Sequence, residues 1–315
     1  MEAKNVKVLS KSSLPAALPD VNVLIYFLVF ILLMGGSPVA MRIGYSELAP
    51  FWLGFLRFGL GSVVFWLLVG IRHLKIPKGR ALLGPLLYGV LGIGISFLFL
   101  AWGLVKTPAS LAAIFLALVP LMTVILSSLQ GVEPLTIRGI LGSVLTVIGT
   151  SIAVGAASST GELSFVHLGA LILGTVFLAE GGIVVKRFPP NSPIITNAVA
   201  MTVGAILLAV ASAIRGESWV LPSQPITWIA LGYLVFMVSG VAFLLYLQVL
   251  NQWTASGTSY GFVIIPFVTI IISAIIIREQ VTANLLLGAV VVIAGVILGA
   301  LLPQKVKTTR ECLTC

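Results

Sequence analysis

A serine within Gly257-Thr-Ser-Tyr-Gly261 matches the G-x-S-x-G pattern of a hydrolase nucleophile. That pattern works at a strand-to-helix turn with a histidine base beside the serine. Here it opens a long apolar stretch, and the two histidines, His73 and His167, lie in other segments. Cys312 and Cys315 are only two thiols, whereas a structural zinc site needs about four ligands. Because H-E-x-x-H and P-loop motifs are also missing, we expect no catalytic residues, no metal, no cofactor and no ATP-driven pump.

Two charged residues stand inside apolar stretches. Glu180 lies ~6 Å along the helix axis from the middle of its stretch, at 1.5 Å per residue. An ionised acid at that depth costs several kcal/mol unless it is paired or hydrated. It therefore suits proton coupling or cation sensing, but a structural pair with a basic residue, or snorkelling to the cytosolic face, remains open. Arg57 keeps its proton, so it must pair, snorkel to the external face or bind a substrate carboxylate.

Prolines inside apolar stretches predict kinks with a possible gating role. Pro120 and Pro266 each free a backbone carbonyl one turn earlier, at Leu116 and Phe262. In a membrane, such polarity is tolerated only against protein or a wet cavity. Ser37 and the following Pro38 predict a third kink, and Ser37 is also a candidate substrate contact.

A polar and aromatic set gathers in the third, eighth and ninth apolar stretches. A cavity for an organic solute needs aromatic walls and a few hydrogen-bonding groups. Alternatively, Trp102, Trp253 and Tyr246 belong to an interfacial aromatic belt. The set consists of Trp102, Tyr246, Gln248, Asn251, Ser256, Thr258, Ser259 and Tyr260.

Composition defines the elements that must position these residues. Hydrophobic residues make up 59% of 315, charged residues 9%, and the mean hydropathy is +1.18. Soluble domains carry roughly 25% charged residues, so most of this chain must face lipid. Stretches of ~20 apolar residues predict an all-α integral membrane protein with ten transmembrane helices. They run over 23–42, 50–70, 82–104, 108–128, 137–156, 166–186, 193–214, 227–248, 256–277 and 284–302.

The basic residues predict an orientation, because positive charge favours cytosolic loops. With the N-terminus inside, the external side holds only Arg42, Lys106, Arg215 and Arg278. The cytosolic side holds Lys4, Lys7, Lys11, Arg72, Lys75, Lys78, Arg80, Arg138, Lys186, Arg187, Lys305, Lys307 and Arg310. This places both termini in the cytosol. The basic residues behind the net charge of +9 lie beside the apolar stretches, as orientation signals do, so we expect no nucleic-acid partner.

Residues 1–21 and 303–315 are predicted to be cytosolic tails. The apolar stretch from Val21 has no short core followed by a cleavage site, so we expect it to be the retained first span. In the second tail, Cys312 and Cys315 also satisfy the positional form of a prenylation box, with Cys as the last residue. Acylation and redox chemistry stay open for this pair.

The two halves resemble one another at an offset of 146 residues. Glu133 then faces Glu279, Pro120 faces Pro266, and Gly149 faces Gly295. Apolar bias does not supply matches of Glu, Pro and Gly. We therefore predict two five-helix repeats, at 22–157 and 165–302. Because five is odd, the second repeat must be inverted, an arrangement that recurs in secondary transporters.

At this point the chain resembles the drug/metabolite transporter superfamily, in its ten-helix EamA-like branch. The resemblance rests on gE-x-x-t-x(5)-G-x(6)-G at 132–149 and again at 278–295, on Pro120 and Pro266, and on Arg57. It implies a central cavity lined chiefly by spans one, three, four, six, eight and nine. It also implies export or exchange of amino acids, metabolites or drug-like compounds.

The expected function is thus secondary active transport, as an exporter or exchanger, of small organic solutes by alternating access in the plasma (inner) membrane, with protons as the candidate coupling ion. A passive facilitator of the same solutes is the alternative, followed by an intramembrane enzyme or lipid-handling protein. The expected partners are a small-molecule substrate, the lipid bilayer and protons. Substrate identity, direction and oligomeric state stay open.

Overall fold

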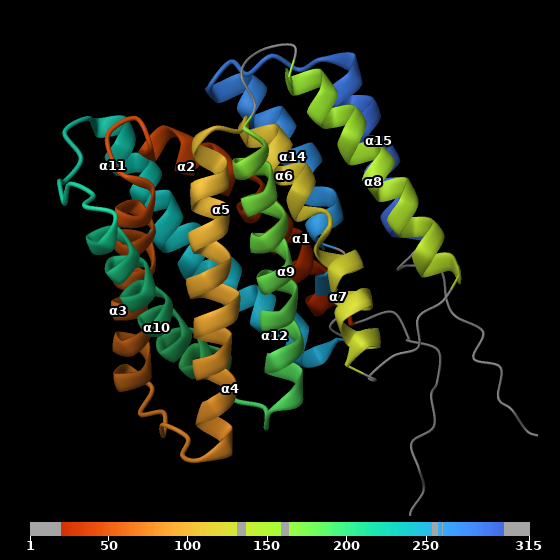
Figure 1. The fold of residues 1–315 in the computed structure, drawn as a ribbon. Helices are drawn as coiled ribbons and strands as arrows, with labels where there is room; N and C mark the ends of the chain where they lie inside the picture. The colour runs from red at the N-terminus through yellow and green to blue at the C-terminus, as the bar shows by residue number, and fades with distance from the viewer. Residues whose placement is uncertain (1–19, 131–136, 159–163, 254–257, 260, 299–315) are drawn as a thin grey trace, which may run out of the picture.

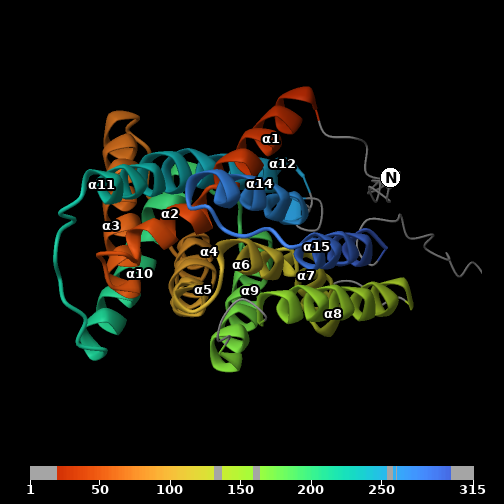
Figure 2. The same ribbon diagram turned by 90° about the horizontal axis from the view of Figure 1, so that it is seen from above.

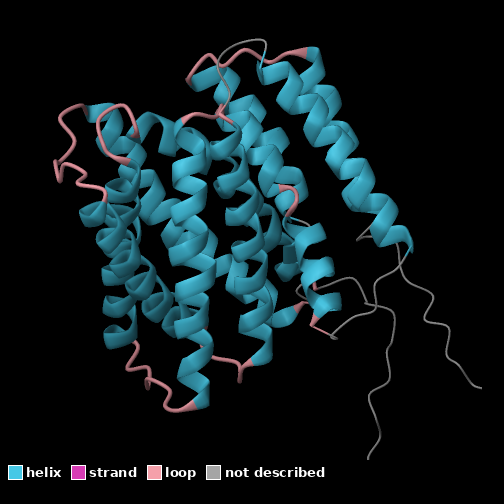
Figure 3. Cartoon of the chain, in the orientation of Figure 1, coloured by secondary structure: helices cyan, strands magenta, loops and turns pink. Residues whose placement is uncertain are grey.

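A computed structural model describes residues 20–130, 137–158, 164–253, 258–259 and 261–298. Within these ranges the chain is helical and contains no strand (Figure 3). Seven helical segments are long and apolar enough to cross a membrane: Val21–Gly44, Pro50–Ile71, Arg80–Val105, Ala109–Leu129, Phe165–Arg187, Pro193–Ile214 and Pro225–Gln252. Shorter apolar helices cover Val144–Ala153, Gly261–Ile276 and Ala283–Gly295. These ten segments coincide with the ten predicted spans, so the chain is a multi-pass integral membrane protein.

The described residues of the first repeat form nine helical elements. They are α1 (Val21–Gly35), α2 (Ser37–Gly44), α3 (Pro50–Ile71), α4 (Arg80–Tyr88), η1 (Gly89–Ile95), α5 (Ser96–Val105), α6 (Ala109–Leu116), α7 (Val119–Leu129) and α8 (Ile137–Ser158). The second repeat contains α9 (Phe165–Arg187), α10 (Pro193–Ile214), α11 (Pro225–Gly232), η2 (Tyr233–Ala242), α12 (Phe243–Gln252), α14 (Gly261–Ile276) and α15 (Ala283–Val296).

Several spans are interrupted inside the bundle. Span one changes from α1 to α2 at Gly36, directly before the predicted kink at Pro38. Span four breaks between α6 and α7, one turn before Pro120, because proline cannot donate the next helical hydrogen bond. Span nine differs, since α14 runs through Pro266 as one helix. Its symmetry partner breaks, so the two repeats are not conformationally identical here.

Spans three and eight share another interruption. Each contains a π-helical segment, η1 at Gly89–Ile95 and η2 at Tyr233–Ala242. Adding the offset of 146 to η1 gives 235–241, which falls inside η2. π-helical turns are rare and occur frequently at functional sites. The duplication is therefore visible in the local geometry as well as in the residue types.

The repeats run in opposite directions across the bundle. Loops 45–49, 106–108, 215–224 and 277–282 lie at one end, and loops 72–79 and 188–192 lie at the other (Figure 1). Span one therefore ends where α9, the first helix of the second repeat, begins. Apart from Arg57 inside the bundle, the described basic side chains divide accordingly. Arg72, Lys75, Lys78, Arg80, Lys186 and Arg187 lie at the second end, and Arg42, Lys106, Arg215 and Arg278 lie at the first.

Helices α8 and α15 lie side by side at one edge of the bundle (Figures 1 and 2). They meet through glycines: a Cβ on Gly149 would stand 2.6 Å from Val292 N, and one on Gly295 would stand 2.8 Å from Gly142 O. Small residues let membrane helices approach at backbone distance. The described residues of this pair are absent from the wall of the central cavity. Spans five and ten therefore pack together through small-residue faces, away from the cavity.

Candidate functional site

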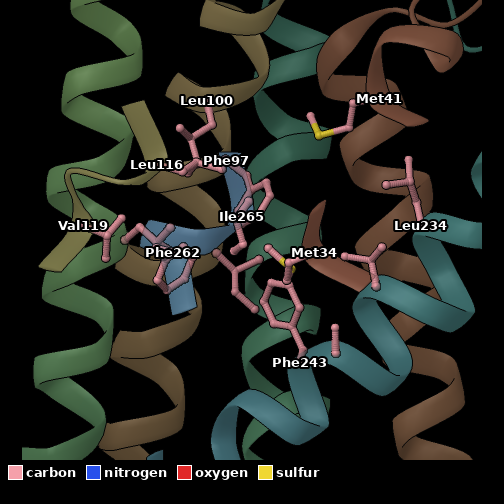
Figure 4. Packing of buried hydrophobic residues seen from close by; sticks show 14 of the residues in the cluster. Met34, Met41, Phe97, Leu100, Leu116, Val119, Leu234, Phe243, Phe262 and Ile265 are labelled. Carbon is pink, nitrogen blue, oxygen red and sulfur yellow. The ribbon is translucent and has the colours of Figure 1, made fainter. Parts of the chain in front are cut away.

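A cavity of about 50 Å³ lies where the two repeats meet. Figure 4 shows Met34, Phe97, Phe243 and Phe262 converging on this region from four different helices. The wall is formed by Phe30, Met34, Ser37, Pro38, Met41, Tyr88, Phe97, Leu100, Leu104, Ala112, Leu116, Leu171, Leu178, Phe243, Tyr246 and Phe262. These residues come from spans one, three, four, six, eight and nine, the set that the resemblance implied.

The wall is apolar and aromatic with three hydroxyl groups, those of Ser37, Tyr88 and Tyr246. Among the described wall residues there is no carboxylate, lysine, arginine or histidine. Such a surface can surround an apolar organic body and hydrogen-bond to it at a few points. Within the described residues no group of histidine, cysteine and acidic side chains could hold a metal ion.

Leu116 and Phe262, the two residues whose carbonyls the prolines release, both lie on the cavity wall. They are related by the offset of 146, as are Pro120 and Pro266. The sequence argument required these places to face protein or a cavity. The structure places both beside the cavity, whereas Pro120 and Pro266 are not wall residues.

An aromatic cluster stands on one side of the cavity. The ring of Phe30 lies 5.5 Å from that of Tyr246 and 5.8 Å from that of Phe262, and Tyr246 and Phe262 are 6.1 Å apart. Phe27 extends the cluster to Trp253, with an edge-to-face contact at 5.6 Å. Tyr246 is therefore a wall residue, whereas Trp253 packs behind the wall.

Arg57 lies in the interior, with 1% of its surface exposed. Its Nε donates to Ser239 Oγ at 3.0 Å, and its Nη1 donates to Ser37 Oγ at 3.3 Å and to Met41 Sδ at 3.6 Å. The guanidinium carbon also lies 4.7 Å from the centre of the Phe58 ring. Snorkelling to the external face, one of the sequence interpretations, is therefore wrong for this structure.

Glu180 is half-buried and accepts a hydrogen bond of 2.7 Å from Gln130 Nε2 on α7. It is not among the wall residues of the cavity. Neither a basic partner nor a direct place in the cavity is thus found among the described contacts. The adjacent glycines, Gly181 and Gly182, allow close approach. A Cβ on Gly181 would stand 2.5 Å from the Cα of Gly92, and one on Gly182 would stand 3.0 Å from the hydroxyl of Tyr246.

Two of the remaining candidates, Trp102 and Gln248, are described and are not wall residues of the cavity. The Trp102 ring packs 5.1 Å from the ring of His167, and the guanidinium carbon of Arg215 lies 5.8 Å from the centre of the Trp102 ring. That position at the end of α5 fits the alternative of an interfacial belt. Gln248 is half-buried on α12 but is not a wall residue. The candidates Tyr260 and Ser256 lie outside the described residues.

Sequence reasoning missed the carboxylates that join the repeats at one end. Glu279 accepts hydrogen bonds from Ser110 N (3.3 Å) and Ser110 Oγ at the start of α6. Glu217 accepts from Trp52 N (2.9 Å) at the start of α3, and Glu47 accepts from Gln224 N (3.2 Å) before α11. Anions are stabilised at helix N-termini. Each carboxylate belongs to the repeat opposite its helix, a pairing that only three-dimensional proximity reveals.

Comparison with known proteins agrees with this architecture. The profile of the EamA-like transporter family matches residues 22–155 and 165–300. The "Uncharacterized transporter YyaM" of Bacillus subtilis is 29% identical over 88% of this chain and 92% of its own length. A "Probable terminal-alkyne amino-acid exporter" of Streptantibioticus cattleyicolor is 23% identical over 82% and 86%. A solved crystal structure without a functional description shares the fold, with a TM-score of 0.67 at 18% identity, over 89% of this chain and 96% of that one. This chain belongs to the EamA-like transporter family.

Proposed function

We propose that the chain is a secondary transporter that exports or exchanges small organic solutes by alternating access. One observation carries the proposal: an apolar cavity lies between two inverted repeats and takes its wall from three spans of each. Rocking one repeat against the other around a site at their interface opens the site to each side in turn. The amino-acid exporter among the relatives is consistent with a small organic solute.

The interruptions in the helices supply the hinges for this motion. Span one bends at Gly36 and span four at Leu118, and both spans line the cavity. The π-helical segments of spans three and eight lie at equivalent positions in the two repeats. Hinge residues are element-terminal positions that absorb backbone rotation. Movement at these points would change the cavity wall without breaking the helices elsewhere.

The three carboxylates Glu47, Glu217 and Glu279 support an assignment of the conformation. Each ties a loop of one repeat to a helix start in the other, all at the end that carries loop 106–108. Opening at this end requires that at least one of these ties is released. We therefore assign this structure to a state closed at that end, which the charge pattern predicts to be external.

Glu180 is the proposed coupling group, in an indirect role. It contacts Gln130 on α7, while α6, the other half of the same span, carries Ala112 and Leu116 on the cavity wall. Protonation neutralises the carboxylate and weakens the hydrogen bond that its oxygen accepts. The helix α7 can then move relative to α9, and the break at Leu118 transmits this movement to α6 and the cavity wall.

The charge pattern of the loops supports cytosolic termini, and we place the protein in a plasma (inner) membrane.

Flux measurements in proteoliposomes test the proposal. Purified protein is reconstituted, and efflux of amino acids, other metabolites and drug-like compounds is measured with and without a pH gradient. Filling the cavity by Ala112→Phe should abolish flux, because Ala112 is 5% exposed and lies on the wall. Ala294→Phe, at an exposed position on α15, is the matched control and should keep wild-type flux.

Two outcomes would change the assignment. If Ala112→Phe blocks flux but the wild-type protein never accumulates solute against its gradient, the alternative, a passive facilitator, is identified. Flux that is equal in Ala112→Phe and Ala294→Phe would remove the cavity as the solute path.

A further inference from the structure

The guanidinium of Arg57 is a buried positive charge without a carboxylate partner among the described residues. Its hydrogen bonds go to two serine hydroxyls and a thioether, and its Nη2 has no partner. Arginine keeps its charge in proteins. A cation in a low-dielectric interior costs several kcal/mol unless it is compensated. The described surroundings of Arg57 supply only part of that compensation.

Aromatic rings provide some of it. The guanidinium carbon lies 4.7 Å from the ring centre of Phe58, 5.0 Å from that of Phe97 and 5.9 Å from that of Phe243. Ring faces attract cations through their quadrupole, but they carry no net charge. The site therefore holds a positive charge in place and leaves it electrically unbalanced.

This charge lies directly behind the cavity wall. Four side chains around the guanidinium, those of Ser37, Met41, Phe97 and Phe243, are themselves wall residues. Of these, Met41 is the most adaptable, because its unbranched side chain has three rotatable bonds. Its sulfur is a weak acceptor, whereas a carboxylate oxygen forms a charge-assisted hydrogen bond about twice as strong as a neutral one. A carboxylate in the cavity would be the better partner for Nη1 and for the free Nη2.

The rest of the wall argues against other charge types. An ammonium group in the cavity would meet the hydroxyls of Ser37, Tyr88 and Tyr246, but no carboxylate among the described wall residues. It would also stand near the positive charge of Arg57. Cations are therefore disfavoured, and zwitterions gain less than plain anions. The apolar remainder of the wall suits an aliphatic or aromatic body.

We propose that Arg57 is the anion-recognition residue of the cavity and that the transported solute is a small organic monoanion, a carboxylate with an apolar body. The proposal rests on the function proposed above and narrows its substrate class. Binding moves the Met41 side chain aside and pairs the carboxylate with Arg57. The loaded cavity is then electrically neutral, while the solute body contacts the aromatic rings of the wall.

Four compounds with the same phenyl body separate the charge types. These are 3-phenylpropionate (anion), 3-phenylpropanol (neutral), 3-phenylpropylamine (cation) and phenylalanine (zwitterion). Binding is measured as the thermal shift of the purified wild-type protein, and transport as flux in proteoliposomes. We expect 3-phenylpropionate to bind at least about tenfold more tightly than the other three, because hydrogen bonds to a charged group contribute about a factor of 10 to 100.

Variants test whether Arg57 is responsible. Arg57→Gln should remove the preference for the anion and Arg57→Lys should weaken it, since lysine keeps the charge but loses the planar fork. Arg215→Gln is the matched control, because this exposed arginine lies at the end of α10, away from the cavity wall. If Arg57→Gln does not fold, the ranking in the wild-type and Arg57→Lys proteins decides.

The results separate the two proposals. Equal or tighter binding of the alcohol, the amine or phenylalanine by the wild-type protein would overturn the anion site and leave the transport function standing. Undiminished preference for 3-phenylpropionate in Arg57→Gln would overturn the role of Arg57. Absence of flux for every solute of the wider screen would instead contradict the transport function.

Discussion

The contact between α8 and α15 gives a quantitative prediction about stability. A Cβ added by Gly288→Ala would stand 2.7 Å from Gly149 O and 2.8 Å from Ala153 N, whereas ordinary contacts begin at 3.4 Å. Because both neighbours are backbone atoms, the helices must separate by about 0.6 to 0.7 Å, the difference between these distances. Overpacking of this kind costs about 1–3 kcal/mol. Alanine regains about 1 kcal/mol of helix propensity relative to glycine.

Gly169→Ala isolates the steric part of this cost. Gly169 lies in α9, and a Cβ there would meet nothing within 4 Å, so only the gain in helix propensity remains. We expect Gly288→Ala to be less stable than Gly169→Ala by about 1–3 kcal/mol. The assay is thermal unfolding of both purified variants in one detergent, followed by tryptophan fluorescence. Equal melting temperatures, or a selectively altered solute preference in Gly288→Ala, would refute the close and purely structural contact.

Three further predictions follow from other residues. Glu180→Gln should melt within a few degrees of the wild type and still exchange solute, but it should lose accumulation driven by a pH gradient; unchanged gradient-driven accumulation in proteoliposomes would remove Glu180 as the coupling group. The hydrogen bond from Ser223 lowers the pKa of Glu47 from its ordinary value of 4.5. The stability contributed by the ionised Glu47 carboxylate is therefore present above pH 4.5 and is lost as the pH falls through the lowered pKa. In an acid titration of the melting temperature, Glu47→Gln should lose part of this dependence, and a parallel curve would contradict the cap. For orientation, in a background without the native cysteines, an impermeant thiol reagent added to intact cells should label Val220→Cys but not Lys78→Cys, and the reverse pattern would invert the assigned topology.

The fold followed from the sequence because a bilayer leaves few alternatives. Backbone groups in lipid must be satisfied internally, so an apolar stretch of sufficient length is a helix. The offset of 146 then related Pro120 to Pro266 and identified Leu116 and Phe262, both of which line the cavity. The different local geometry of the two prolines was not predictable. Whether a proline breaks a helix, as near Pro120, or is absorbed within it depends on packing in the particular conformation.

The candidate site was only partly accessible to sequence reasoning. Ser37 and Tyr246, two of the candidates from the sequence, lie on the cavity wall, and Arg57 lies directly behind it. Trp102 and Glu180 lie elsewhere. The sequence could not show this, because an apolar span has no clear period that distinguishes the sides facing lipid, the cavity and other helices. Tyr88 was overlooked for the same reason. Contacts across the repeats, such as that of Glu279 with Ser110, join residues 169 positions apart and leave no local signal.

Solute counterflow tests the central claim, that one cavity between the repeats is exposed to each side in turn. Proteoliposomes are loaded with an excess of an unlabelled solute identified in the flux screen, diluted, and supplied with a trace of the same solute in labelled form. Alternating access predicts that the unlabelled solute inside drives transient accumulation of the label, and that Ala112→Phe abolishes it. Label that only equilibrates, at a rate independent of the solute on the opposite side, would contradict alternating access.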